Sequence, residues 1–237
     1  MRAYLLLFIL AAPLAEAGWF THEETRTLSL DADAITALHV ESRHGFVIVE
    51  GDETADEITV TATIKVPRSN ESKAHEIMAD ALTLSLDSED QTATLKGYFP
   101  DSVWHFGDGP SVSLKVSVPQ HMAVSIDDGT GFIVVNDIHG DIDIDDGSGS
   151  IELQNVGGVV RIEDGSGWID AKMIGGDVHI DDRSGAITVS DVTGSVTIDD
   201  GSGGITVDDV SENLIILSDG SGRLRFHGID GYVKTGS

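Results

Sequence analysis

The second half of the chain alternates apolar and polar residues in short stretches that return every 18 residues. In the unit from Gly185 to Asp200, Ile187 and Val189 flank one polar residue, and Val196 and Ile198 flank another. Alternation of this kind is typical of a half-buried β-strand. Glycines interrupt the unit at two places, so each unit is expected to contain two short strands and two tight turns.

One of the two turns carries an Asp-Gly-Ser-Gly motif or a close variant of it. Its leading aspartates are spaced by 18 residues and, in the last interval, by 19: Asp128, Asp146, Asp164, Asp182, Asp200 and Asp219. A fixed short period indicates a structural unit stacked on copies of itself, and strands of about six residues suit one rung of a parallel β-solenoid. An antiparallel meander is the alternative. The solenoid is favoured because identical turns at an identical period stack in register.

The first half of the chain predicts less regular β-structure with one helix. Residues 58–66 alternate with strict period two, and shorter strands are expected at 28–30, 37–40, 46–50, 82–86, 92–96 and 112–118. Asn70 or Ser72 can cap a helix that runs to about Ala81. The sequence therefore predicts an all-β protein in two parts. A β-rich N-terminal region with a helix near 70–81 spans residues 18–120, and a parallel β-solenoid with 18-residue rungs spans residues 121–237.

The N-terminus has the features of a secretory signal peptide. Met1-Arg2 is basic, residues 3–14 are almost wholly apolar, and Ala15-Glu16-Ala17 matches the small-x-small cleavage pattern. The apolar run is too short to span a bilayer comfortably. We therefore expect residues 1–17 to be removed and the mature protein to be exported, without membrane insertion, to a periplasm, to the cell surface or to the medium.

The charge of the chain excludes some classes of partner. There are 14 basic and 41 acidic residues, which gives a formal net charge of −27. Such a chain repels phosphate backbones and anionic membrane surfaces, which argues against nucleic acid as a partner. Excess acid also keeps a long β-surface soluble. The absence of cysteine excludes disulfides, cysteine zinc sites and a cysteine nucleophile.

The turn aspartates allow two interpretations. In an Asx-turn, the carboxylate accepts hydrogen bonds from the backbone N–H groups that follow it. In a calcium ladder, carboxylates of adjacent rungs share ions, and Asp128, Asp146, Asp164, Asp182, Asp200 and Asp219 become the metal ligands. Calcium-binding β-rolls place the aspartate after the glycines, whereas here it precedes them. The Asx-turn is therefore favoured, with calcium as the alternative and no other cofactor predicted.

No catalytic motif can be recognised. The sequence has no Gly-x-Ser-x-Gly elbow and no phosphate-binding loop, and no pair of carboxylates stands out for glycoside hydrolysis. The nine histidines show no His-x-His or His-x-x-x-His spacing, so the sequence does not indicate a zinc site. Trp104 and Phe106 are interpreted as a cap on the end of the solenoid core. Exposed aromatics, Trp168 included, can instead stack on sugar rings or anchor a partner.

The repeat resembles a known family. Its pattern is Gly-x-Ile-x-Val-x-x-Val-x-Gly-x-Val-x-Ile, followed by a polar turn and Ser-Gly, which resembles the bacterial putative-adhesin domain family of exported proteins. Residues 40–51 and 57–60 resemble the first strands of that family, and residues 114–119 resemble the strand-proline step that enters its repeats. The resemblance implies an exported β-solenoid without a catalytic site.

The expected function is that of a non-enzymatic cell-envelope or surface protein of the adhesin type. It would bind a protein, a glycan or itself through the solenoid faces or through an open C-terminal rung, where the chain ends after Lys234. A calcium-stabilised acidic β-solenoid is the first alternative. A polysaccharide-active enzyme is the second, and the scarcity of arginine and lysine in the repeats argues against it.

Overall fold

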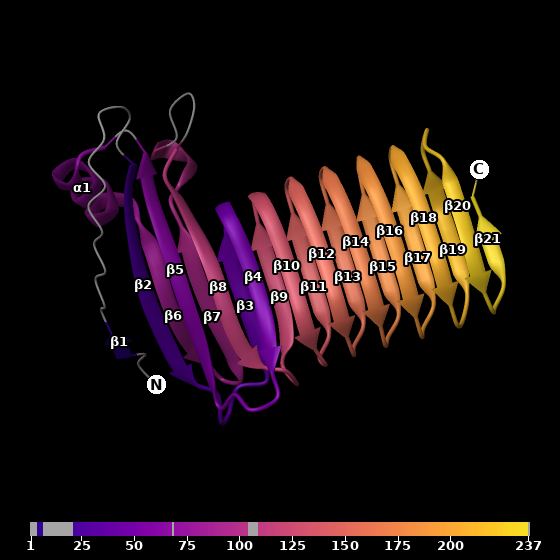
Figure 1. The fold of residues 1–237 in the computed structure, drawn as a ribbon, viewed down its shortest axis with the longest axis horizontal. Coiled ribbons are helices and arrows are strands. Elements are labelled where there is room, and N and C mark those ends of the chain that lie inside the picture. Colours follow the sequence, from indigo (N-terminus) through magenta and orange to yellow (C-terminus); the bar gives the residue numbers. More distant parts are fainter. Residues whose placement is uncertain (1–3, 7–20, 68, 104–108, 237) are drawn as a thin grey trace.

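The computed structural model describes residues 4–6, 21–67, 69–103 and 109–236, which form two long β-sheets that run side by side along the molecule (Figure 1). Sheet A has 11 strands and sheet B has 10. The spatial order in sheet A is β1 (Tyr4–Leu6), β2 (Thr21–Asp31), β5 (Glu57–Pro67), β8 (Ser111–Pro119), β4 (His44–Asp52), β10 (Thr130–Ile138), β12 (Gly149–Val156), β14 (Gly167–Ile174), β16 (Gly185–Val192), β18 (Gly203–Val210) and β20 (Leu224–Ile229). The order in sheet B is β21 (Val233–Thr235), β19 (Leu214–Asp219), β17 (Val196–Asp200), β15 (Val178–Asp182), β13 (Val160–Asp164), β11 (Ile142–Asp146), β9 (Ala123–Asp128), β3 (Ala37–Ser42), β7 (Thr92–Tyr98) and β6 (Thr83–Glu89).

Each 18-residue repeat forms one rung of a parallel β-solenoid, which confirms the predicted fold class. A short strand in sheet B leads through the Asp-Gly-Ser-Gly turn into a longer strand in sheet A, and a second turn returns the chain to sheet B. From β9 to β21, every strand pairing is parallel and joins equivalent residues of neighbouring rungs, with one register shift at Leu217 between β17 and β19. The meander alternative is therefore wrong. The inward isoleucines and valines of both sheets fill the space between them.

The glycine that ends the turn motif is required by this stacking. At Gly149, Gly167 and Gly203, φ lies between 150° and 154°, a region that side chains rarely adopt. A Cβ at each of these positions would overlap the carbonyl oxygen of the equivalent glycine one rung earlier. Neighbouring rungs thus touch backbone to backbone at this corner, and no side chain fits between them.

One rung comes from the first half of the chain. β3 pairs in parallel with β9, and β4 pairs in parallel with β10, so residues 37–52 form the rung that precedes the repeats. The chain then departs to build β5 to β8 on the far side of that rung, and it returns at β9. Both sheets therefore contain strands from before and after residue 120, and they continue without a break across the predicted boundary. Whether residues 18–120 and 121–237 behave as two domains stays a prediction.

The remaining N-terminal elements complete the other end of the molecule. β2, β5 and β6 pair antiparallel with their neighbours, and the strands expected from alternation are present with somewhat wider bounds. Helix α1 (Glu71–Ala81) lies at this end (Figure 1) and buries Ala74 and Met78. Its N-cap is Asn70, whose side chain accepts a hydrogen bond from the backbone N–H of Lys73 at 2.9 Å, as predicted. A 3₁₀ turn covers Asp101–Val103.

Two sequence predictions fall largely outside the described residues. Most of the expected signal peptide, apart from the short strand β1, belongs to residues 1–3 and 7–20, and Trp104, His105 and Phe106 belong to residues 104–108. β1 pairs antiparallel with β2. Within the described ranges, none of the helices combines the length and the apolar character needed to cross a bilayer.

Candidate functional site

The leading aspartates of the turn motif form a buried row between the two sheets. Each ends a short strand in which alternate residues point inward, so the second aspartate of each Asp-Asp or Glu-Asp pair enters the core. Equivalent aspartates are partners in the parallel pairing, about 4.8 Å apart. Five of them are between 0% and 7% exposed: Asp128, Asp146, Asp164, Asp182 and Asp200. Asp219 pairs with Asp200 but is partly exposed.

The Asx-turn interpretation is confirmed in four rungs. Oδ1 of the aspartate accepts a hydrogen bond from the backbone N–H of the serine two residues later, at 3.3, 3.1, 3.0 and 2.9 Å for Asp146, Asp164, Asp182 and Asp200. Oδ2 of the same four residues is buried without a hydrogen-bond partner. Both carboxylate oxygens of Asp128 are buried without a partner at full hydrogen-bond geometry, but the Ser42 hydroxyl and the backbone N–H of Gly129 lie near enough to lower the pKa of this carboxyl. The turns at Asp146, Asp164, Asp182 and Asp200 therefore each satisfy one oxygen of their aspartate and leave the other unpaired inside the protein.

Burial changes the acidity of this row. It raises the pKa of Asp128 and Asp182 to about 6 and that of Asp146 to about 7, and it also raises the pKa of Asp164 and Asp200. For Asp146, the charges of Asp128 and Asp164 on either side raise the pKa further. Hydrogen bonds from the turn amides and shared cations are two ways in which the repulsion between stacked carboxylates can be relieved. Proton uptake near neutral pH is a third means.

The row of buried turn aspartates offers few ligand atoms to a bound metal ion. Calcium takes six to eight oxygen atoms, whereas a single file of aspartates places two carboxylates next to any one position between rungs. In the described part of the chain, the turn aspartates do not form a group of three whose ligand atoms lie within 4.8 Å of one another. Calcium binding at these aspartates stays a prediction.

Ser42 extends the row by one rung, and the sequence analysis did not include it. It pairs with Gly97 on one side, and its strand β3 is in register with β9 such that Ser42 precedes Asp128 in the row. Ser42 is buried, and its hydroxyl lies near the Asp128 carboxyl, where it partly offsets the rise in the pKa of that group that burial causes. The sequence does indicate this position of Ser42, because residues 42–46 are a degenerate copy of the turn at residues 128–132.

A second acidic row lies on the outer face of sheet B, one residue before the buried row. It consists of Glu41, Asp127, Asp145, Glu163, Asp181 and Asp199, which are partners in successive strand pairs. Among the described residues, ion pairs to this row are found only at Glu41, with Lys96 at 2.7 Å and His39 at 3.8 Å. Beside the row, Arg161, His179 and Leu217 help to line a shallow groove of about 300 Å³. The outer face of sheet B is therefore strongly anionic.

The outer face of sheet A carries exposed aromatic rings. Phe46 on β4 stacks on Phe132 of β10, with ring centroids 5.0 Å apart and planes 16° from parallel. Trp168 lies in the same row two strands farther along, beyond Ser150. Phe132 and Trp168 are 41% and 46% exposed. Trp168 was a candidate from the sequence, but its place in one row with the two phenylalanines was not predictable, because these come from segments 86 residues apart.

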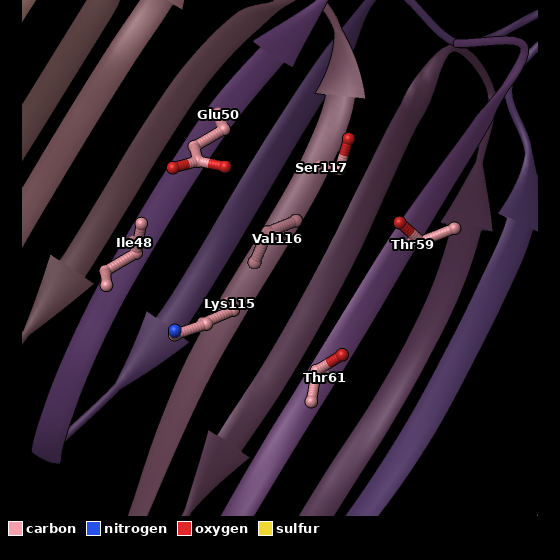
Figure 2. A pocket seen from close by; sticks show the side chains of 7 residues that line it. All are labelled: Ile48, Glu50, Thr59, Thr61, Lys115, Val116 and Ser117. Carbon is pink, nitrogen blue, oxygen red and sulfur yellow. The ribbon is translucent and has the colours of Figure 1, made fainter.

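A shallow pocket of about 200 Å³ lies on the outer face of the same sheet, and its lining begins at Ile48, two residues after Phe46 on β4. Figure 2 shows that its lining comes from three neighbouring strands, β4, β8 and β5. The lining residues are Ile48, Glu50, Thr59, Thr61, Lys115, Val116 and Ser117. Hydroxyls, one ammonium and one carboxylate are thus grouped around a small apolar floor, which can hold a ligand through both hydrogen bonds and apolar contact.

Comparisons with solved structures identify chains of similar architecture. A "putative cell adhesion protein" from Clostridium sporogenes ATCC 15579 is 10% identical, with a TM-score of 0.35, over 91% of this chain and 99% of the other. A "putative adhesin" from Bacteroides fragilis NCTC 9343 is 11% identical, with a TM-score of 0.36, over 93% and 98% of the two chains. A "putative adhesin" from Parabacteroides merdae ATCC 43184 is 11% identical, with a TM-score of 0.29, over 88% and 95%. Similarity this low carries no information about function. No curated protein matches the chain.

A family model settles the relationship. The model named Toastrack DUF4097 matches residues 35–235, which include the first rung, the excursion that follows it and all the repeats. The family resemblance that the repeat pattern indicated is thereby confirmed. The chain belongs to the Toastrack DUF4097 family.

Proposed function

We propose that this protein is a non-enzymatic, exported cell-envelope or surface protein of the adhesin type, and that the outer face of sheet A binds a glycan. The observation that carries the proposal is the row of aromatic rings formed by Phe46, Phe132 and Trp168 on a flat face. Export is supported by the signal-peptide pattern of residues 1–17.

The arrangement of the rings suits an extended sugar chain. Ser150 and Ala186 flank Trp168 in its row, so the exposed indole has a small residue on either side and is accessible to a ligand. Phe132 lies two strands away, at about 10 Å. Aromatic faces pack against the apolar C–H faces of sugar rings. An extended glycan can reach both rings at once, whereas a single sugar cannot.

The surroundings of the rings favour a glycan over a protein partner. Stable protein interfaces have a contiguous apolar core, whereas Ser150 separates Trp168 from the two stacked phenylalanines here. The neighbouring pocket supplies the hydroxyls of Thr59, Thr61 and Ser117 and the charges of Lys115 and Glu50. These are the donors and acceptors that sugar hydroxyls need.

Replacement of the rings is expected to weaken glycan binding by at least tenfold. The variants are Trp168→Ala and Phe132→Ala, because truncating an anchoring aromatic typically costs about 2 kcal/mol or more. Binding of soluble polysaccharides and peptidoglycan fragments would be measured by titration calorimetry after a glycan-array screen. Leu217→Ala is the matched control, since Leu217 is also an exposed apolar residue but lies on sheet B. Absence of any glycan binding, or equal weakening by Leu217→Ala, would contradict the proposal.

A second candidate partner is another copy of the chain, through the last rung. Phe226 and Val233 occupy the positions of Val207 and Leu214, which are buried one rung earlier, yet both are exposed. Strands β20 and β21 also present unpaired backbone groups along one edge, and such edges pair with other strands. We expect concentration-dependent association in sedimentation velocity, reduced by Phe226→Glu and unaffected by Leu217→Ala. A monomer at all concentrations up to the millimolar range would rule this partner out.

A further inference from the structure

We propose that His22, Glu24 and His75 form a binding site for a divalent transition-metal ion of the zinc class. His22 and Glu24 lie two residues apart on β2 and therefore share one face of the strand, and His75 lies on α1. Oε2 of Glu24 is 4.0 Å from Nε2 of His22 and 3.9 Å from Nε2 of His75. The two imidazole rings meet edge to face, with centroids 5.1 Å apart. One ligand atom from each residue lies within 4.8 Å of the other two.

These polar side chains occupy the inward face of the strand. The same alternation along β2 buries Leu28 and Leu30 farther along. The side chains of Glu24 and His22 are only 10% and 18% exposed. Nε2 of His22 is buried and has no hydrogen-bond partner. A buried polar atom without a partner is costly, and a metal ion bound at this nitrogen removes that cost.

The carboxylate is already oriented for an ion. Nε of Arg26 donates a hydrogen bond to Oε1 of Glu24 at 2.6 Å, which leaves Oε2 directed at the two imidazoles. Partners of this kind fix the geometry of metal ligands in known sites. A tetrahedral zinc ion with bonds of about 2.0–2.1 Å holds its ligand atoms roughly 3.3 Å apart. Small side-chain rotations close the remaining difference.

The ligand set and the access to the site indicate the class of ion. Two imidazole nitrogens and one carboxylate oxygen suit zinc and its first-row neighbours, whereas calcium and magnesium prefer all-oxygen sites. His75 is largely exposed, and a hollow of about 250 Å³ lined by His22, Thr21 and residues 69–71 opens beside the cluster. An ion can enter by this route and keep a water molecule as its fourth ligand. The net charge of −27 attracts cations to the whole surface.

The test is a titration of the full-length mature chain with Zn²⁺, followed by competition against a chromophoric chelator. One ion is expected to bind per chain at micromolar or tighter affinity. His75→Ala and Glu24→Gln should each weaken binding at least tenfold. Co²⁺ should show the intense visible bands of a tetrahedral site. His75 is on an exposed helix face, so its replacement leaves the fold intact and keeps the result interpretable.

His179→Ala is the matched control, because His179 lies in the groove on sheet B, away from α1 and β2. It should bind Zn²⁺ as the wild type does. No Zn²⁺ binding at 100 µM by the wild type, or unchanged binding by His75→Ala, would overturn the metal site.

Discussion

Gly203→Ala is expected to lower the free energy of unfolding by several kcal/mol, whereas Gly204→Ala, one residue later, should leave it unchanged or raise it by up to about 1 kcal/mol. A Cβ at Gly203 would overlap the carbonyl oxygen of Gly185, and φ at Gly203 is 154°. A Cβ at Gly204 meets nothing closer than the carbonyl oxygen of Arg223 at 3.9 Å. Urea unfolding of the two variants and the wild type, followed by circular dichroism, measures the difference.

The pair is informative because the two substitutions are chemically identical and adjacent. Both replace glycine by alanine on the same strand, β18, so changes in helix or strand propensity and in the unfolded chain are nearly the same. Only the approach of the neighbouring rung and the backbone angle differ. Equal destabilisation by both variants would show that backbone-to-backbone stacking at the glycine corner does not limit the stability of the solenoid.

Asp146→Asn is expected to stabilise the protein by up to about 4 kcal/mol at pH 8, by less than half of that at pH 5, and to have little effect below about pH 4. Burial raises the pKa of Asp146 to about 7, well above the value of 3.8 expected in the unfolded chain. A carboxyl group of this kind binds its proton more tightly in the folded state. Its contribution to stability is complete below about pH 4 and is lost as the pH rises to about 7. Asparagine keeps the Oδ1 acceptor for Ser148 and cannot ionise.

The matched control is Asp145→Asn, which removes the same charge from the adjacent residue on the outer face. It should change the dependence of stability on pH much less. The measurement is the midpoint of thermal unfolding of both variants and the wild type between pH 5 and pH 8.5. The wild type is expected to unfold at a lower temperature at pH 8.5 than at pH 5. A shift of equal size for the two variants would mean that overall charge, and not burial, governs the effect.

Bound calcium would reverse the expected effect of Asp146→Asn on stability. If the buried row held calcium, millimolar calcium would raise the unfolding midpoint of the wild type at pH 8, and a chelator would lower it. Asp146→Asn would then lose this stabilisation and become less stable than the wild type. If protons compensate the stacked charges, calcium and chelator leave both proteins unchanged. The same unfolding experiment therefore separates the two interpretations of the turn aspartates.

The fold of the repeats could be predicted because each rung is determined by a pattern within 18 neighbouring residues. Each rung repeats the same alternation and the same turns, and stacking in register follows from the period alone. The rung of β3 and β4 was not identified as a repeat, because Ser42 replaces the aspartate and the next copy is 86 residues away instead of 18. Gly45-Phe46 nevertheless matches Gly131-Phe132, so a comparison without a fixed period could have found it.

The candidate sites were less accessible from the sequence. Period-two alternation from Ile144 places Asp146 on the inward face, but aspartate is usually exposed, and its burial was not inferred. His22 and His75 lie in different elements, and the path of the chain between them decides whether they meet. No spacing rule for metal ligands covers such a pair.

The position of the β3–β4 rung determines when the chain can complete its two sheets. Within the repeats, every strand pairs with a strand 18 or 19 residues farther along the chain, whereas Phe46 pairs with Phe132, 86 residues later. Closing a longer loop costs more entropy and slows folding. During synthesis, β3 and β4 leave the ribosome well before β9 and β10, because they come earlier in the chain. Until β9 and β10 arrive, the edge of β3 and of β4 that they will cover has no partner strand. We expect the repeats to assemble first and the N-terminal strands to dock on them afterwards, so that the end of the molecule made first is the last to fold.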